Sequence, residues 1–185
     1  MQQQEELELI RRIVNGETDL YAILARRYGR VVYTLVSRIV GCAEDAEELA
    51  QDVFLKAFRN LHRFNGRSSF PTWLFRIAYN TAISSVRKKR YEFLAIEETT
   101  LENVSEEEIT NLFGQTESTE QVQRLEVALE QLLPDERALI LLFYWKEKTI
   151  EELVSITGLT ASNIKVKLHR IRKKLFVLLN GMDHE

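Results

Sequence analysis

Several chemistries are excluded by what this 185-residue chain lacks. It contains one cysteine, Cys42, so no disulfide can form within it. Its histidines, His62, His169 and His184, are scattered, and no spacing typical of a metal site is present. Glycine-rich phosphate loops and nucleophile motifs are also missing. We therefore expect a protein that holds no cofactor or metal and is not itself an enzyme.

Long apolar runs are missing as well. The N-terminal residues MQQQEELELIRRIV lack the basic start and apolar run of a signal peptide. No later run reaches the roughly 20 residues that cross a bilayer. We expect a cytoplasmic protein with no direct membrane insertion. Its 45% hydrophobic and 29% charged residues are ordinary for a globular chain, which at this length forms one domain or two small ones.

Positive charge is absent from residues 91–121, which contain no Lys or Arg. The acidic residues of this segment are Glu92, Glu97, Glu98, Glu102, Glu106, Glu107, Glu108, Glu117 and Glu120. The modest net charge of −3 therefore hides an acidic segment between two basic ones. Because the segment has no sustained apolar period, we predict a flexible linker between domains at 1–90 and 122–185. It is either a plain tether or a mimic of nucleic acid that occupies a basic channel on a partner.

The stretch FNGRSSFPTWLFRIAYNTAISSVRKKR, from Phe64 to Arg90, predicts a helix with two unlike faces. A core-facing stripe has the spacing i, i+3, i+4, i+7 and consists of Leu74, Ile77, Ala78 and Thr81. Another side carries Trp73, Arg76, Asn80, Ser84 and Arg87. That side combines an aromatic plane for stacking, guanidinium groups for phosphate and an amide that can read a base edge. The alternative is an amphipathic helix with a half-buried Trp and a basic C-terminus that complements its dipole.

A second signal lies in residues 149–175, TIEELVSITGLTASNIKVKLHRIRKKL. The pattern is that of a helix-turn-helix, with a turn at Gly158 and a second helix capped by Thr160 or Ser162. The basic residues of the second helix are Lys165, Lys167, His169, Arg170, Arg172, Lys173 and Lys174. No acid interrupts them, whereas an ordinary solvated helix would interleave Glu. The strip is therefore expected to face a phosphate backbone.

The remaining periodicity predicts an all-α protein of two small helical domains. Further helices are expected at 7–14, 20–39, from Ala43 onward, 122–133 and 134–145, which gives the second domain four helices. In the helix from Ala43, the residues expected to face inward are Ala46, Leu49, Ala50, Val53, Phe54, Ala57, Phe58 and Leu61. Its other side carries Glu44, Asp45, Glu48, Gln51, Asp52, Leu55 and Lys56. An exposed Leu among polar groups is either a harmless surface residue or the centre of a docking face.

Two blocks in this order resemble a bacterial sigma factor of the extracytoplasmic-function (ECF) group. They are AEELAQDVFLKAFRNLHRFNGRSSFPTWLFRIAYNTAISSVRKKR and, after the acidic segment, LPDERALILLFYWKEKTIEELVSITGLTASNIKVKLHRIRKKL. The resemblance covers nearly the whole chain apart from the linker. It implies a factor that binds core RNA polymerase at the β′ clamp and β flap, directs it to promoter DNA and helps open the duplex for transcription initiation. It also implies an anti-sigma factor, often membrane-bound, and a linker that threads toward the RNA exit path.

The resemblance also implies three sets of site residues. The set that binds core polymerase is Asp45, Glu48, Gln51, Asp52, Leu55 and Lys56. The set that captures an unpaired base of the −10 element is Phe64, Asn65, Arg67, Ser68, Phe70, Trp73, Arg76, Asn80 and Arg87. The set that reads the −35 element in the major groove is Lys165, Val166, His169 and Arg170, with Lys173 nearer the backbone. Many members have a small or polar residue where Val166 stands, so the preferred −35 sequence stays open.

Two other classes of protein remain as alternatives. A stand-alone helix-turn-helix regulator of duplex DNA would explain residues 149–175 but would leave the Trp73 face without a role. A helical adaptor that binds only proteins would explain the acidic helix but not the basic one. An electrophoretic shift with and without core polymerase separates all three, because only a sigma factor requires core enzyme for specific DNA binding.

Overall fold

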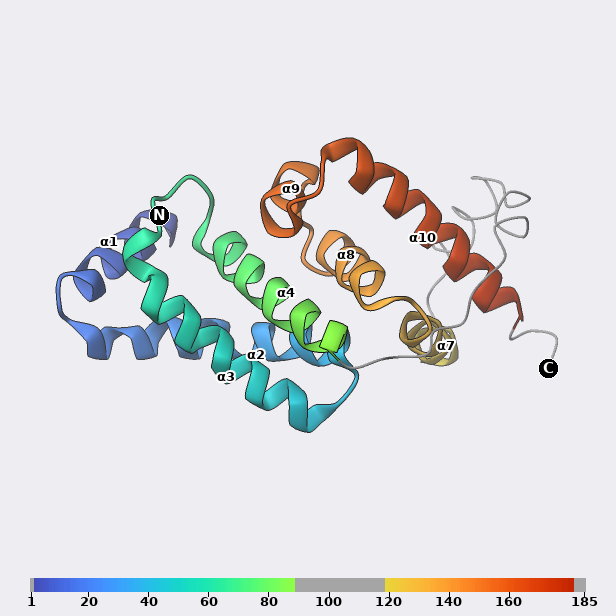
Figure 1. Ribbon diagram of the computed structural model, residues 1–185, viewed down its shortest axis with the longest axis horizontal. Helices are drawn as coiled ribbons and strands as arrows, with labels where there is room; N and C mark the ends of the chain where they lie inside the picture. Colours follow the sequence, from blue (N-terminus) through green and yellow to red (C-terminus); the bar gives the residue numbers. More distant parts are fainter. Residues whose placement is uncertain (1, 89–118, 182–185) are drawn as a thin grey trace.

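The fold is all-α, as the periodicity predicts (Figure 1). The computed structural model describes residues 2–88 and 119–181, and these ranges contain helices and turns but no strand. The first four helices form an N-terminal bundle and the last four a C-terminal bundle, side by side. Most of the predicted linker lies outside the described residues.

The N-terminal bundle is built by helices that end at local signals in the sequence. Its helices are α1 Gln2–Val14, α2 Tyr21–Val40, α3 Ala43–Asn60 and α4 Phe70–Lys88, with 3₁₀ turns η1 Thr18–Leu20 and η2 Leu61–Arg63. Helix α2 stops where Gly41 adopts φ +75°, a conformation that a Cβ atom disfavours. Helix α4 starts where Ser69 Oγ accepts the backbone N–H of Thr72 at 3.3 Å. The end of α2 and the start of α4 are therefore both set by residues at the helix termini.

One residue of α3 departs from the predicted inward face. Ala46, Ala50, Val53 and Ala57 are buried as expected. Phe58 is instead 39% exposed, and its ring lies at the edge of the bundle, 4.9 Å from the ring of Tyr21. The periodicity assigned Phe58 to the core because Phe58 adjoins the inward-facing residues of α3. Those residues include three small alanines, so α2 and α3 pack together without the Phe58 ring.

The C-terminal bundle contains the predicted helix-turn-helix. Its helices are α7 Thr119–Glu130, α8 Pro134–Tyr144, α9 Ile150–Thr157 and α10 Ala161–Gly181. Helix α9 begins with a capping box, in which Thr149 Oγ1 accepts the Glu152 N–H and Glu152 Oε2 accepts the Thr149 N–H. Gly158 turns the chain at φ +76°. Thr160, not Ser162, caps α10, because its Oγ1 accepts the Asn163 N–H at 3.2 Å.

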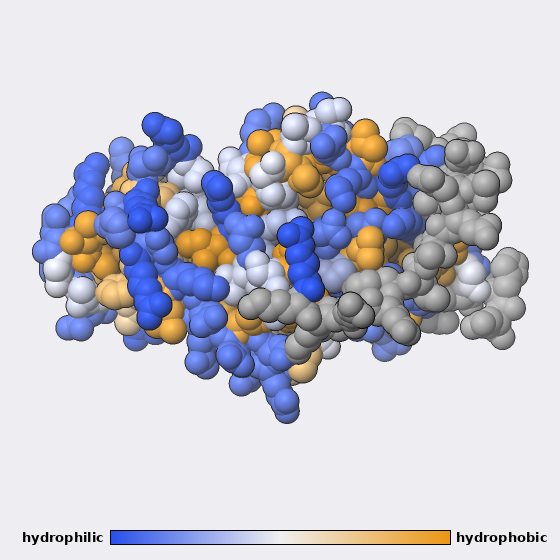
Figure 2. Space-filling model, viewed as in Figure 1, coloured by the Kyte–Doolittle hydropathy of each residue, from blue (hydrophilic) through white to orange (hydrophobic). Residues whose placement is uncertain are grey.

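The two bundles share one hydrophobic core. Helix α4 packs against α8 and α9, and α2 packs against α8 (Figure 1). Two helices of the N-terminal bundle therefore contact the C-terminal bundle. Buried side chains from both bundles form a single cluster. The outer surface in this view is mostly hydrophilic, with separate rather than continuous hydrophobic patches (Figure 2).

Candidate nucleic-acid interface

Helix α4 presents both of the faces that its sequence predicts. Leu74, Ala78 and Thr81 are buried, and Ile77 packs against them. On another side, Arg76, Asn80, Ser84 and Arg87 are exposed, and Trp73 is half-buried at the start of the strip. Guanidinium, amide and aromatic groups therefore share one surface that a ligand can reach.

An aromatic cluster holds Trp73 at the edge of this surface. The Trp73 ring lies 5.5 Å from Phe64 and 5.7 Å from Phe70, measured between ring centroids. Phe70 also lies 5.5 Å from Tyr28 and is only 2% exposed. Phe70 therefore cannot stack on a base in this conformation, contrary to its expected role. It is a core residue that supports Trp73, because its ring contacts those of Tyr28, Phe64 and Trp73.

The loop before α4 contributes further polar groups. Asn65 and Arg67 are exposed, whereas Phe64 and Ser68 are half-buried. Asn65 Oδ1 accepts the Arg67 N–H at 3.2 Å across Gly66, whose φ is +71°. This tight turn places the Asn65 and Arg67 side chains beside the N-terminus of α4.

The outer side of α3 forms a separate polar surface. Glu48, Gln51, Asp52, Leu55 and Lys56 are exposed, and Asp45 is half-buried. Leu55 exposes 53% of its surface among carboxylates and amides. Lys56 Nζ lies 3.9 Å from Asp52 Oδ2, a surface ion pair of little energetic weight. The arrangement has the polar rim and small apolar centre of a protein docking face.

The basic residues of α10 divide into an outer and an inner group. Lys165, Val166 and Arg170 are exposed, with 54% exposure for Val166, and His169 and Lys173 are half-buried. The four predicted readers therefore lie in the first half of α10, and Lys173 lies just beyond its middle.

The inner group is bound to α8 instead. Lys174 Nζ lies 2.6 Å from Glu136 Oε1, and Lys167 Nζ lies 3.0 Å from Asp135 Oδ2. The Arg172 guanidinium packs 5.7 Å from the Tyr144 ring centroid. Only part of the uninterrupted positive charge of α10 is therefore available to a ligand. Part of it neutralises the acidic first turn of α8, which the sequence reading missed.

A third face of α4 was not predicted. It consists of Thr72, Phe75, Tyr79 and Val86, all buried. Burial, with the Asp135 charge acting in the same direction, raises the pKa of Tyr79. These residues face the C-terminal bundle, as the contact of Lys148 with Phe75 shows. The sequence did contain a signal for this buried face, because the apolar residues Phe75 and Tyr79 are four positions apart and lie outside the core stripe.

Other kinds of site were sought in the described ranges. Residues 2–88 and 119–181 contain no group of three or more His, Cys, Asp or Glu residues that could hold a metal ion. None of the helices described is both long and apolar enough to cross a membrane.

Comparison with known proteins assigns both bundles to one class. Residues 24–91 match the family Sigma-70 region 2, and residues 122–175 match Sigma-70, region 4. The first match covers most of α2 to α4, and the second covers most of α7 to α10. Together these regions define a promoter-directing sigma factor rather than a stand-alone regulator.

Relatives that align over about nine-tenths of their length identify the group of sigma factors. The chain is 31% identical over 173 residues to the ECF RNA polymerase sigma-E factor of Escherichia coli (strain K12), which covers 90% of each chain. It is 29% identical over 177 residues to the ECF RNA polymerase sigma factor SigW of Bacillus subtilis (strain 168), covering 90% of this chain and 92% of SigW. The protein belongs to the ECF group of RNA polymerase sigma factors.

Solved structures share the fold. CnrH, solved in complex with the cytosolic domain of CnrY, aligns with TM-score 0.67 and 22% identity over 94% of this chain and 96% of CnrH. The sigma factor RpoE from Bartonella quintana, solved with the anti-sigma factor NepR, aligns with TM-score 0.65 and 24% identity over 86% of this chain and 96% of RpoE. At these identities the likeness concerns the fold alone.

Proposed function

We propose that three separate surfaces divide the work of this sigma factor. The outer side of α3 docks on core polymerase, the exposed strip of α4 captures the −10 element, and the outer residues of α10 read the −35 element. The observation that carries the proposal is the exposed strip Arg76, Asn80 and Arg87 beside Trp73. A regulator that reads only duplex DNA has no use for an aromatic capture site on a second bundle.

The α4 strip suits an unpaired strand. A base cannot be read on all its edges while it is stacked in a duplex, so a protein that opens DNA needs a site for the flipped base. Trp73 offers an aromatic face, Asn80 an amide for a base edge, and Arg76 and Arg87 bind phosphates. Stacking energy recovered at Trp73 would offset part of the cost of unpairing.

The α10 surface suits the major groove, whose width of about 12 Å admits an α-helix. Lys165 and Arg170 can donate to guanine acceptors, and Val166 can pack on a thymine methyl. Lys173 lies farther along the helix, where a phosphate contact would position the helix without reading sequence.

The proposed partners follow from the assignment of the surfaces to separate tasks. We propose that α3 binds the β′ clamp, that the C-terminal bundle binds the β flap, and that the protein acts in the cytoplasm as an initiation factor rather than an enzyme. We further propose a protein inhibitor of the anti-sigma type, membrane-bound or free. Its support is that one protein of the same fold, RpoE, was solved with an anti-sigma factor. We also propose domain limits at 1–90 and 122–185, with support from the family matches at residues 24–91 and 122–175.

A mobility-shift and transcription experiment tests the proposal. Wild-type protein should give a specific promoter shift and transcripts only when core polymerase is present. Selection from a library randomised at −35 should then show that Val166→Ser changes the preferred base at one position and leaves the −10 preference unchanged. Specific binding of equal strength without core enzyme would contradict the proposal, and identical base preferences would remove Val166 from the reading surface.

A further inference from the structure

Helix α1 buries one of its acidic side chains. Glu6 is 7% exposed, whereas Glu8 on the same helix is exposed. Glu6 Oε1 accepts a hydrogen bond from the Tyr28 hydroxyl at 2.6 Å and another from Arg27 Nη1 at 3.3 Å. Both donors belong to α2, so the carboxylate joins the first two helices. It needs such partners, because an unpaired carboxylate in an apolar setting has a high desolvation cost.

Tyr28 connects this carboxylate to the aromatic cluster around Trp73. Burial, and then the hydrogen bond to Glu6, raises the pKa of Tyr28, so its hydroxyl stays protonated and donates. The Tyr28 ring lies 5.5 Å from Phe70, measured between centroids. Phe70 lies in turn 5.8 Å from Phe64 and 5.7 Å from Trp73. A continuous series of contacts therefore runs from the Glu6 carboxylate to the Trp73 ring.

Helix α1 also lies against the loop that precedes α4. It packs on η2, the 3₁₀ turn from which the loop begins. Leu7 Cδ2 approaches the backbone at Gly66 so closely that a Cβ atom there would lie 3.7 Å from it. Gly66 is the centre of the turn in which Asn65 Oδ1 accepts the Arg67 N–H. Two successive residues of α1, Glu6 and Leu7, therefore support the ring cluster and the loop.

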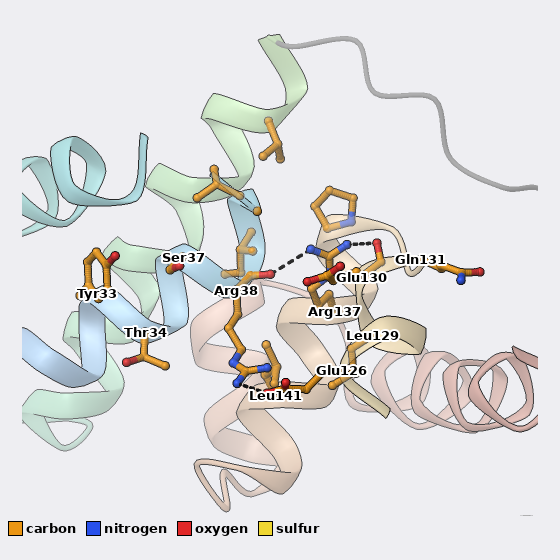
Figure 3. A pocket seen from close by; sticks show the side chains of 15 residues that line it. Tyr33, Thr34, Ser37, Arg38, Glu126, Leu129, Glu130, Gln131, Arg137 and Leu141 are labelled. Atoms are coloured by element: carbon orange, nitrogen blue, oxygen red, sulfur yellow. Dashed lines mark hydrogen bonds and ion pairs between the residues drawn. The ribbon is translucent and has the colours of Figure 1, made fainter. Parts of the chain in front are cut away.

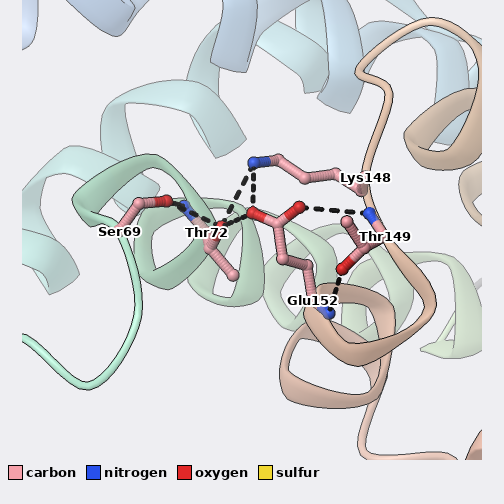
Figure 4. A network of polar contacts seen from close by, with 5 residues as sticks. All are labelled: Ser69, Thr72, Lys148, Thr149 and Glu152. Atoms are coloured by element: carbon pink, nitrogen blue, oxygen red, sulfur yellow. Dashed lines mark hydrogen bonds and ion pairs between the residues drawn. The ribbon is translucent and has the colours of Figure 1, made fainter.

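The first turn of α4 is held on another side by a polar network (Figure 4). Thr72 Oγ1 donates to Glu152 Oε1 at 2.6 Å and lies 2.8 Å from Ser69 Oγ. Thr72 and Trp73 are adjacent in the sequence, so their side chains differ by about 100° around the helix axis. The network thus holds the start of the helix, while the Trp73 ring takes its support from the aromatic cluster.

Helix α2 faces two different neighbours along its length. Its second half lines a groove of about 770 Å³, in which Tyr33 and Arg38 lie opposite Glu126 and Arg137 (Figure 3). Tyr28 lies five residues before Tyr33, so the two side chains are about 140° apart around the axis. The Tyr28 side chain contacts α1 and α4 of its own bundle. Its support of the aromatic cluster therefore does not depend on the C-terminal bundle.

We propose that Glu6 is a positioning residue for the −10 capture surface, and that it acts through Tyr28 and Phe70 to hold the Trp73 ring in the orientation that accepts an unpaired base. This role rests on the proposed function of α4. Stacking requires the face of the Trp73 ring, so a ring that changes its orientation loses part of the contact with the base. The proposal gives α1 a part in DNA opening, although α1 lies outside the residues 24–91 that match Sigma-70 region 2.

Orientation explains a buried carboxylate at this position better than stability does. Replacement of a buried ion pair by apolar side chains of similar volume is often neutral or stabilising. A hydrogen bond, in contrast, accepts only a narrow range of distances and angles, so the Tyr28 hydroxyl fixes its ring relative to Glu6. If α1 only stabilised the bundle, every variant of α1 would affect DNA binding in proportion to its loss of stability. A positioning role predicts an effect that is confined to DNA with an unpaired −10 element.

Three substitutions in the full chain remove or preserve the contact. Glu6→Leu keeps the helix propensity and the approximate size of the side chain but removes the acceptor of the Tyr28 hydroxyl. Glu6→Gln keeps an acceptor oxygen and should behave as wild type does. Tyr28→Phe keeps the ring and removes only the hydroxyl.

Two further substitutions in α1 serve as controls. Glu8→Leu removes an exposed carboxylate, whose ion pair with Arg11 spans 3.5 Å, from the same helix. Ile13→Ala removes a side chain that is 3% exposed in the last turn of α1, about 10 Å along the axis from Glu6. It should lower the melting temperature without changing the contacts of Tyr28.

Binding of the polymerase-bound factor to two DNA probes measures the effect. Complete loss of a stacked base corresponds to about 5- to 150-fold in affinity, and a misoriented ring keeps part of the contact. Glu6→Leu and Tyr28→Phe should therefore weaken binding to a fork with a single-stranded −10 element by about 3- to 10-fold. Binding to a duplex that carries only the −35 element, and the affinity for core polymerase, should not change. Both control variants should bind both probes as wild type does at a temperature where all are folded.

Tryptophan fluorescence reports the ring itself. The chain contains two tryptophans, so in a Trp145→Phe background all the emission comes from Trp73. Glu6→Leu and Tyr28→Phe should increase the quenching of Trp73 by acrylamide and lower its anisotropy, whereas Ile13→Ala should change neither. In a Trp73→Ala background, Glu6→Leu should cause no further loss of fork binding, because residues that act through one another are not additive.

Each outcome decides between the two explanations. An equal loss of fork binding in Glu6→Leu and Ile13→Ala at matched stability would overturn the positioning role, and so would additive losses with Trp73→Ala. If Glu6→Leu does not fold, Tyr28→Phe gives the decision alone, since it leaves both rings and the carboxylate in place. If Trp73→Ala itself binds the fork as wild type does, the proposed function of α4 is wrong. If Trp73→Ala weakens binding but Glu6→Leu and Tyr28→Phe do not, only the positioning role is wrong.

Discussion

Two adjacent lysines of α10 should fail in different ways when each is replaced by Ala. Lys173 is half-buried and is proposed to contact phosphate, whereas Lys174 Nζ lies 2.6 Å from Glu136 Oε1. Their side chains differ by about 100° around the helix axis, which is why one points toward solvent and the other toward α8. The sequence reading expected both to bind phosphate, so the pair is a direct test of the structure.

The size of the effect follows from the surroundings of Glu136. Its side chain is 11% exposed, and its other oxygen accepts the Leu133 N–H at 3.3 Å. Lys174→Ala removes the closer partner of a nearly buried carboxylate, and a hydrogen bond to a charged group contributes about 1.5–3 kcal/mol. At about 2–4 °C per kcal/mol for a cooperative unit of this size, the melting temperature should fall by about 3–12 °C.

Thermal unfolding and salt-dependent promoter binding separate the two lysines. Lys173→Ala should leave the melting temperature nearly unchanged and lower the slope of log K against log salt by about one unit. Lys174→Ala should lower the melting temperature and leave the slope unchanged. A double-mutant cycle with Glu136→Ala should give a coupling of about 0.5–3 kcal/mol. A lowered salt slope for Lys174→Ala without any loss of stability would refute the assignment.

Four further variants have distinct expected outcomes. Trp73→Ala should weaken promoter opening by about 1–3 kcal/mol, measured by permanganate reactivity of the −10 region. It should also lower the melting temperature, because the Trp73 ring packs in the aromatic cluster. If the variant is folded at the assay temperature, full activity on a premelted promoter confirms the DNA role, and an equal loss of activity on that promoter argues against it. Gln51→Ala with Asp52→Lys should weaken co-purification with core polymerase at unchanged stability, and undiminished co-purification would rule out that face. Gly158→Ala should destabilise the fold by about 1–2 kcal/mol, because Gly158 has φ +76°. Gly29→Ala should stabilise the fold by about 0.5–1 kcal/mol, because Gly29 lies in a helix with open space around it. Calorimetry that gives changes of the same sign in the unfolding free energy of both variants would contradict the backbone argument.

Features set by neighbours in the sequence were predictable. The ends of α2 and α9 follow from Gly41 and Gly158, and the start of α9 follows from Thr149 with Glu152 three residues later. Such signals act within one turn of the backbone, so the chain carries them whatever it packs against. The two predicted faces of α4 are of the same kind, because periodicity alone places their residues.

Features set by distant residues were not predictable. Lys174 appeared to be a phosphate ligand because its partner Glu136 lies 38 residues away in the sequence. Thr72 had no evident role because Glu152, its partner, lies 80 residues away and in the other bundle. Phe70 was assigned to DNA by its place in a motif, while its burial depends on Tyr28 of α2. One-dimensional patterns show which residues share a face but not what covers that face.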